Sequence, residues 1–115
     1  MLELERGVRD GRRLWEKLGA GSSYKIDFRT DFPAEGAIPD LVFFGSSLQY
    51  FPDYGAVIDQ TVATGADYIL FSNSLIGDIK THCSLQVNIN GTGMAVWKIN
   101  LDEFLDRFKD KYRLI

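Results

Sequence analysis

Two short apolar runs, separated by a helical pattern, constrain the fold more than any other feature of the sequence. Residues 41–44 (LVFF) and 68–71 (YILF) show no alternation of apolar and polar residues, which is typical of parallel strands buried on both faces. Between them, residues 54–64 have a helical pattern, with Asp53 as the expected N-cap and Gly65 as the end. This order predicts a right-handed βαβ unit with a parallel sheet.

The remaining segments predict further helices and strands around this unit. An amphipathic helix is expected at residues 4–18, ending at Gly19 and Gly21. The other expected elements are a strand at 24–28, a loop at 29–39, a strand at 84–89, a loop at 90–96, a helix at 101–110 capped by Asn100 with Leu101, Phe104, Leu105 and Phe108 facing inward, and a last strand at 112–115. We therefore expect residues 1–115 to form a single α/β domain with a mainly parallel sheet flanked by helices.

Composition excludes several classes of protein. The formal net charge is −3, which argues against a general nucleic-acid binder because such proteins present a basic face. No apolar run approaches the roughly 20 residues of a membrane span, and the charged N-terminal residues lack the apolar segment of a signal peptide. The single cysteine, Cys83, excludes an internal disulfide and a multi-cysteine metal site. A cytoplasmic protein without a membrane or nucleic-acid partner is the expectation.

Small polar residues follow both central strands. Residues 45–47 (GSS) come after the first run, and residues 72–74 (SNS) come after the second. Because ligands of open α/β sheets bind beyond the carboxyl ends of the strands, these residues are candidates for a ligand site. Glu3 and Asp27 are acidic candidates that could accept hydrogen bonds from a ribose or an adenine. Ordinary turn chemistry explains the same residues equally well, and both interpretations stay open.

Residues 40–53 (DLVFFGSSLQYFPD) and the following AVIDQTVATGADYILFSNS resemble the fourth strand, helix and fifth strand of class I S-adenosylmethionine-dependent methyltransferases. More narrowly, they are similar to a group of bacterial methyltransferases with an LQYLPD-type signature. Residues 3–11 (ELERGVRDG) resemble the E-L-x-x-V-x-x-G helix of that group, with Val8 and Gly11 each one position later, and residues 94–97 (MAVW) with the closing LDEFLDRFKDKYRLI are similar to its last segment. The resemblance covers essentially all 115 residues and implies an incomplete Rossmann-like methyltransferase fold.

The resemblance also implies roles for individual residues. Glu3 matches the acid that holds the cofactor ribose, and Asp27 with Phe28 falls near the family's adenine contacts. Phe44, Gly45 and Ser46 match the turn that borders the methyl donor. The implied residues on the substrate side are Gln49, Tyr50, His82 and Gln86. The expected ligands are S-adenosylmethionine and a methyl acceptor of unknown identity, and no catalytic base is assigned.

Two family elements have no counterpart in the sequence. The first is the strand with a G-x-G-x-G loop that should precede Glu3, because residues 19–21 (GAG) follow a helix instead and residues 91–93 (GTG) fit a hairpin. The second is the seventh strand. We therefore expect a truncated methyltransferase. The missing strands leave three alternatives open: a rearranged sheet, a homodimer through exposed strand edges, or a fragment of a longer protein. We also expect no calorimetric binding of the cofactor by the isolated chain.

Two further classes of function stay open at this point. The chain could be a non-catalytic oligomerising or partner-binding α/β module, or a different nucleotide-handling protein. His82 and Cys83 are adjacent and single of their kind, so they do not supply the three or four convergent ligands of a metal site. Under the family resemblance His82 could be a general base, and otherwise it is a loop or strand histidine. Tyr50 and Trp97 are candidates either for stacking on a flat ligand or for core anchors.

Overall fold

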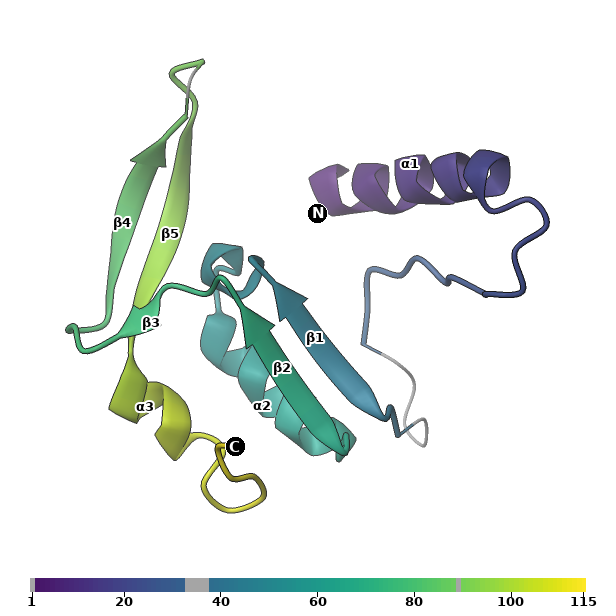
Figure 1. The fold of residues 1–115 in the computed structure, drawn as a ribbon. Coiled ribbons are helices and arrows are strands. Elements are labelled where there is room, and N and C mark those ends of the chain that lie inside the picture. Colours follow the sequence, from purple (N-terminus) through teal and green to yellow (C-terminus); the bar gives the residue numbers. More distant parts are fainter. Residues whose placement is uncertain (1, 33–37, 89) are drawn as a thin grey trace. The chain divides into compact units, whose positions relative to one another are not determined.

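Helix α1 (Leu2–Leu18) is the main element of the first of two compact units, Met1–Ala34 and Glu35–Ile115 (Figure 1). The computed structural model describes residues 2–32, 38–88 and 90–115, except the side chains of residues 2–4. The helix ends as predicted, since the Gly19 N–H donates to the Trp15 carbonyl at 2.7 Å and Gly21 adopts a φ of 90°. Within the described residues, no helix combines the length and the apolar character that crossing a membrane requires.

The segment after α1 does not form the strand predicted at residues 24–28. Apolar alternation makes a strand only where a neighbouring strand completes the ladder. Here the segment instead packs on α1: Arg12 donates from Nη2 to the Phe28 carbonyl at 2.6 Å, and the Phe28 ring lies against Gly11. A Cβ at Gly11 would stand 2.7 Å from that ring, which explains a glycine inside this helix.

Strand β1 (Leu41–Gly45), helix α2 (Tyr54–Thr64) and strand β2 (Tyr68–Ser72) form the predicted βαβ unit (Figure 1). The two strands pair in parallel, with Leu41 opposite Tyr68. Asp53 caps α2 as predicted, because its Oδ1 accepts the Ala56 N–H at 2.9 Å. Gly65 ends the helix in the left-handed region, with a φ of 71°. Local signals thus determine both ends of this helix.

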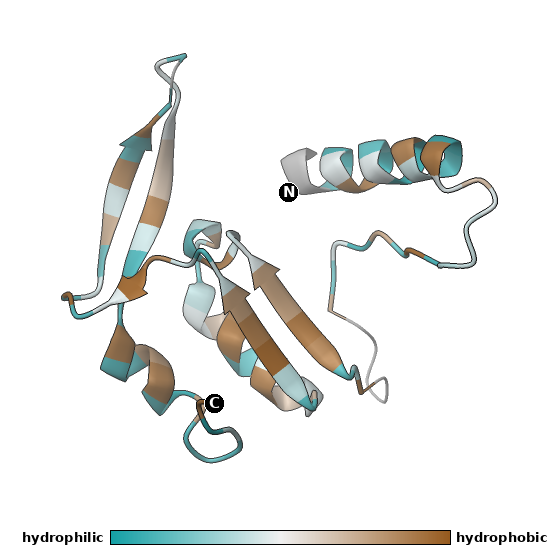
Figure 2. Ribbon diagram, viewed as in Figure 1, coloured by the Kyte–Doolittle hydropathy of each residue, from teal (hydrophilic) through white to brown (hydrophobic). Residues whose placement is uncertain are grey.

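Within unit Glu35–Ile115 the two strands are buried on one face only, whereas burial on both faces was predicted. Phe44 is buried, whereas Leu41, Phe43, Tyr68 and Leu70 are 51–63% exposed. Val42, Ile69 and Phe71 face the core together with Phe44. The reason is that unit Glu35–Ile115 places the core on one side of this pair. The middle of each strand is nevertheless hydrophobic, as Figure 2 shows in brown.

Three further strands form a second small sheet. Strand β3 (Ile76–Gly77) pairs in parallel with β5 (Gly93–Asn100), and β4 (His82–Val87) pairs antiparallel with β5. The α/β class is confirmed, but the strands form two small sheets, and the second of them is partly antiparallel. The loop predicted at residues 90–96 is too long, because Gly93 already pairs with Val87. The predicted strand at 84–89 is confirmed through Val87, and Ile89 lies outside the described residues.

Helix α3 (Leu101–Asp106) follows β5 and is capped as predicted, since Asn100 Oδ1 accepts the Glu103 N–H at 3.0 Å. Of the four residues expected to face inward, Phe104 and Phe108 are buried, but Leu101 is 41% exposed. The strand predicted at residues 112–115 is wrong. Instead the Tyr112 hydroxyl donates to the Ala66 carbonyl at 2.8 Å, and burial together with nearby Asp67 raises the pKa of this phenol.

A single hydrophobic cluster joins the elements of unit Glu35–Ile115. Leu48, on the short helix η1 (Leu48–Tyr50), Ile58 on α2 and Ile99 on β5 are at most 1% exposed. Phe71 stacks on Phe44 with 5.0 Å between ring centroids. The buried members of the cluster are Phe44, Leu48, Ile58, Ile99, Phe104 and Phe108. The cluster holds the carboxyl ends of β1 and β2 in place, because η1 follows β1 directly and packs against β5 and α2.

Candidate functional site

The turns after β1 and β2 share an uncommon backbone conformation. Ser46 has a φ of 54° and Asn73 has a φ of 51°, and within the described residues they are the only non-glycine residues with positive φ. The Ser46 N–H donates to the Ser72 carbonyl at 2.9 Å, which holds the two turns side by side. Left-handed backbone at a residue other than glycine costs of order 1 kcal/mol, although asparagine adopts it more readily than most, and such residues cluster at functional sites. We call these turns, with Gln49 and Ser74, the strand-end site.

Gln49 connects the two turns from within. Its side chain is only 4% exposed. The Nε2 group donates to the Ser46 carbonyl at 3.2 Å and to the Asn73 carbonyl at 3.5 Å. A glutamine suits this position because its amide supplies two N–H donors in one plane. One buried side chain thus satisfies a carbonyl from each strand end.

Two buried polar atoms of the strand-end site have no hydrogen-bond partner within the described residues. They are Gln49 Oε1 and Ser74 Oγ. A buried acceptor left without a partner costs about 1–3 kcal/mol, and buried polar groups are normally paired. Gln49 Oε1 can only accept a hydrogen bond, whereas the Ser74 hydroxyl can accept or donate. The site therefore suits a ligand group that carries N–H or O–H donors.

The structure brings some of the predicted residues to this site and gives others a core role. Gly45 and Ser46 lie at the end of β1, and Tyr50 lies next to Gln49 on η1 with 40% of its surface exposed. Phe44 is buried in the aromatic cluster, so its role is packing. Trp97 donates from Nε1 to the Pro52 carbonyl at 3.3 Å and packs on Tyr54. Of its two predicted roles, the contacts of Trp97 favour the core anchor.

The predicted adenine-side residues belong to unit Met1–Ala34. Asp27 lies 3.9 Å from Arg29, and Arg29 also pairs with Asp31 at 3.2 Å. That hydrogen bond lowers the pKa of Asp31. The side chain of Glu3, the predicted ribose ligand, lies outside the described residues.

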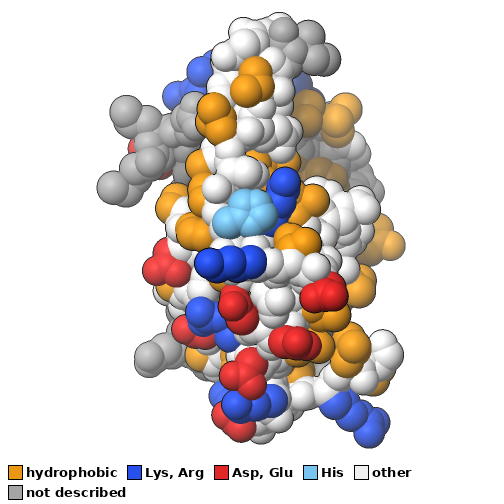
Figure 3. Space-filling model, turned by 90° about the vertical axis from the view of Figure 1, so that its left-hand side faces the viewer, with side chains coloured by type: hydrophobic (Ala, Val, Ile, Leu, Met, Phe, Trp, Pro, Cys, Tyr) orange, Lys and Arg blue, Asp and Glu red, His pale blue; other side chains and the backbone are white. Residues whose placement is uncertain are grey.

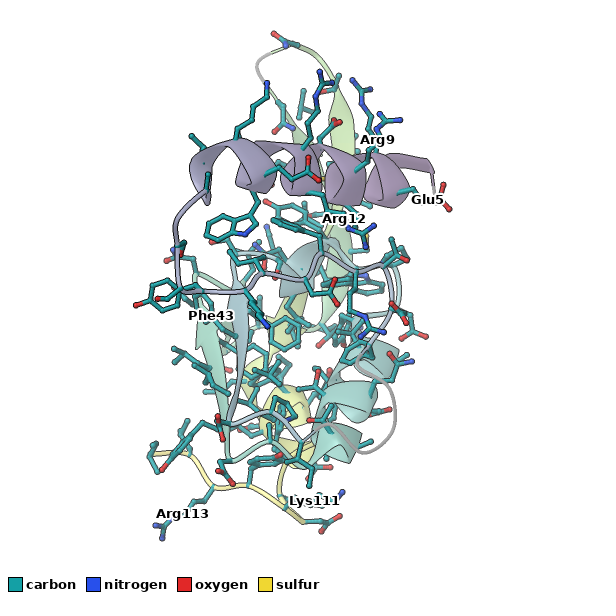
Figure 4. All side chains as sticks on the ribbon, turned by 90° about the vertical axis from the view of Figure 1, so that its right-hand side faces the viewer. Glu5, Arg9, Arg12, Phe43, Lys111 and Arg113 are labelled. Carbon is teal, nitrogen blue, oxygen red and sulfur yellow. The ribbon has the colours of Figure 1, made fainter. Side chains whose placement is uncertain are left out.

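An open groove of about 830 Å³ within this unit is lined by residues of α1 and of residues 27–31. Glu5, Arg9 and Arg12 are labelled in Figure 4 and form its α1 side. Its lining carries side chains of both charges, and Arg9 is also 3.5 Å from Asp10. The charged side chains of this groove are exposed, and such exposed ion pairs contribute little on their own. Its described lining therefore offers no buried polar group around which a ligand site could be built.

The two substrate-side candidates on β4 are exposed and bond within their own segment. His82 Nδ1 lies 2.7 Å from the Lys80 carbonyl, and Gln86 Nε2 donates to Asn88 Oδ1 at 3.1 Å. Figure 3 shows the histidine, in pale blue, on open surface. Nothing in these contacts links His82 or Gln86 to the strand-end site. The described residues contain no group of three or more side chains suited to hold a metal ion.

Asn73 and Ser74 are candidate site residues to which the family resemblance assigned no role. The sequence signal for them was present, since residues 72–74 are a polar run directly after an apolar strand. The hydrogen bond from Gln49 to the Asn73 carbonyl could not be predicted from the sequence, because the two residues are 24 positions apart. Comparisons of the chain with family models, with curated proteins and with solved structures found no match.

Proposed function

We propose that the protein is an S-adenosylmethionine-dependent methyltransferase-like domain, with the strand-end site as one wall of its cofactor site. The observation that supports this most is the position of Gln49 Oε1 and Ser74 Oγ: both are buried without a hydrogen-bond partner among the described residues, at the carboxyl ends of a parallel pair. Ligands of α/β sheets bind at such an edge. The resemblance of residues 40–53 to the methyltransferase signature points to the same edge.

The donor groups of the cofactor fit the two acceptors. An adenosyl group carries an exocyclic amine and two ribose hydroxyls, and its amino acid part carries an ammonium group. Gln49 Oε1 would accept from one of these N–H or O–H groups, and Ser74 Oγ would accept from or donate to a neighbouring one. When bound, the cofactor would supply an electrophilic methyl group. The residues of the chain would contribute binding and orientation, which is most of what methyl transfer requires.

The strand-end site alone would bind weakly, since the sequence supplies no G-x-G-x-G loop between a strand and a helix. We therefore expect S-adenosylhomocysteine to bind with a Kd near 1 mM, about −4 kcal/mol, below the reach of calorimetry at micromolar concentration. Amide spectra recorded during a titration to several millimolar should show shifts at Ser46, Asn73, Ser74 and the Gln49 side-chain NH₂.

A pair of serine variants controls this experiment. Ser74→Ala removes the unpartnered hydroxyl of the site, so it should weaken binding without lowering the free energy of unfolding. Ser84→Ala removes a hydroxyl on β4 that already donates to the Val96 carbonyl, so binding should stay unchanged. The proposal fails if no shifts occur up to the solubility limit, if they concentrate on the β4–β5 hairpin, or if the two variants bind equally.

A further inference from the structure

Strand β2 has a neighbour on one side only. Among the described residues it pairs with β1 alone. The Tyr68 N–H donates to the Asp40 carbonyl and the Ser72 carbonyl accepts from Ser46, so alternate residues 68, 70 and 72 direct their backbone groups toward β1. The intervening residues, Ile69 and Phe71, therefore direct their N–H and C=O groups to the outer edge. Unpaired edges of this kind pair readily with another extended segment.

A groove of about 630 Å³ lies beside this edge, and its lining includes Ile69 and Phe71. Its other wall is made of apolar side chains from α3 and the residues after it, among them Phe104, Leu105 and Tyr112. A row of free backbone groups next to apolar side chains is the arrangement by which proteins add a peptide strand to a sheet. The backbone supplies hydrogen bonds, and the groove accepts alternate side chains.

The charge of this groove differs from that of the whole chain. Among the described side chains that line it, Lys109, Lys111 and Arg113 are basic and Asp67 is acidic, whereas the chain carries a net charge of −3. Lys109 is paired with Asp106 at 2.8 Å. Lys111 donates from Nζ to the uncharged Val62 carbonyl at 3.4 Å, so Lys111 and Arg113 are the cations of this groove without an acidic partner among the described residues. Figure 4 labels these two side chains on the C-terminal segment. Complementary charge therefore favours an acidic partner.

We propose that the groove along β2 binds an extended peptide segment of a partner protein, with apolar residues alternating with acidic ones. The apolar side chains enter the groove between β2 and α3, and the peptide backbone bonds to Ile69 and Phe71. The acidic side chains point to the opposite face of the peptide strand, and the charges of Lys111 and Arg113 attract them through space rather than by contact. This inference does not depend on the cofactor proposal, because it uses the outer edge of β2 and none of the residues of the strand-end site.

Three labelled peptides of about nine residues, long enough to cover the strand, test the proposal on the full chain by fluorescence anisotropy. The first alternates Val with Glu, the second alternates Val with Lys, and the third is the Val/Glu peptide with N-methylated backbone amides. The Val/Glu peptide should bind about tenfold or more tightly than the Val/Lys peptide. The N-methylated peptide should not bind, because it cannot complete the ladder.

Two double variants with the same change in net charge distinguish the effect of the groove cations from the effect of the overall charge on peptide binding. Lys111→Glu with Arg113→Glu should weaken the binding of the Val/Glu peptide about tenfold. Lys17→Glu with Lys25→Glu changes the net charge equally but replaces exposed residues that do not line the groove, so affinity should change less than about twofold. Equal weakening by both pairs would overturn the proposal.

Hydrogen exchange identifies the edge directly. The Val/Glu peptide should slow exchange of the Ile69 and Phe71 amides, whereas the Leu70 amide, which faces β1, should change little. Binding without protection of Ile69 and Phe71 would overturn the proposal. Protection of both amides without peptide, together with a dimer in light scattering, would overturn it in favour of a second copy of the chain.

Discussion

Replacing Gln49 by Glu should destabilise the protein by about 3 kcal/mol at neutral pH. The Gln49 amide donates to the carbonyls of Ser46 and Asn73, and the side chain is 4% exposed. A carboxylate of the same shape would place negative charge against both carbonyl oxygens in a site that water hardly reaches. Urea denaturation followed by circular dichroism measures the loss.

The pH dependence of the free energy of unfolding of Gln49→Glu is a second, independent test. Burial next to two carbonyls raises the pKa of the carboxyl group introduced by Gln49→Glu above its unfolded value of about 4.3. A group whose pKa is raised on folding contributes to the stability of the folded state at pH values below its unfolded pKa. That contribution is lost as the pH rises through the folded pKa. The deficit of Gln49→Glu relative to the wild-type chain should therefore be smallest near pH 4 and largest near pH 7.

A methionine at the same position controls for side-chain volume. Gln49→Met removes both hydrogen bonds without adding charge, and it should cost about 1–2 kcal/mol at either pH. If Gln49→Glu were as stable as the wild-type chain at pH 7, or if its deficit did not depend on pH, the two strand-end turns would not be joined by a buried amide.

Truncating Leu48 to Ala should cost about 3 kcal/mol. Leu48 is fully buried, and it fastens η1 to the core cluster against β5 and α2. The loss combines the transfer free energy of the removed methyl groups with the cavity that they leave. Because η1 carries Gln49, amide exchange at Ser46 and Asn73 should accelerate in the same variant.

Leu85 offers the matched control for this substitution. It is also a leucine in unit Glu35–Ile115, but it lies on β4 and is 70% exposed. Leu85→Ala should change the free energy of unfolding by less than about 0.5 kcal/mol. Equal losses in the two variants would contradict the assignment of Leu48 to the core.

The βαβ unit could be predicted from sequence because its signals are local. Asp53 and Gly65 determine the two ends of α2 by cap chemistry that needs no tertiary partner. Asn100 acts in the same way at the start of α3. The apolar runs on either side then leave few alternatives to a parallel pair.

Predictions that depended on a distant partner were wrong. Residues 24–28 alternate like a strand, but Arg12 and Gly11 of α1 hold them instead. β5 begins at Gly93, where a glycine gives no strand signal, and only Val87 across the hairpin reveals the pairing. An apolar run also cannot indicate which face is covered, so the exposure of Phe43 and Leu70 was not foreseeable.

The candidate site was predictable only in part, for the same reason. Polar residues after two apolar strands indicated Ser46 as a site residue. The left-handed backbone at Asn73 agrees with the tendency of asparagine to adopt positive φ, whereas serine at position 46 gives no such signal. The bridging role of Gln49 likewise depends on β1 and β2 ending together.

The strand-end site exists only if β1 and β2 run in parallel, with their carboxyl-end turns in contact. Long-range HNCO spectra, which detect scalar coupling across hydrogen bonds, measure this directly. We predict correlations from the Ser46 amide nitrogen to the Ser72 carbonyl carbon and from the Tyr68 amide nitrogen to the Asp40 carbonyl carbon. Correlations that pair the two strands in antiparallel order would contradict this prediction, since the two turns would then lie at opposite ends of the sheet.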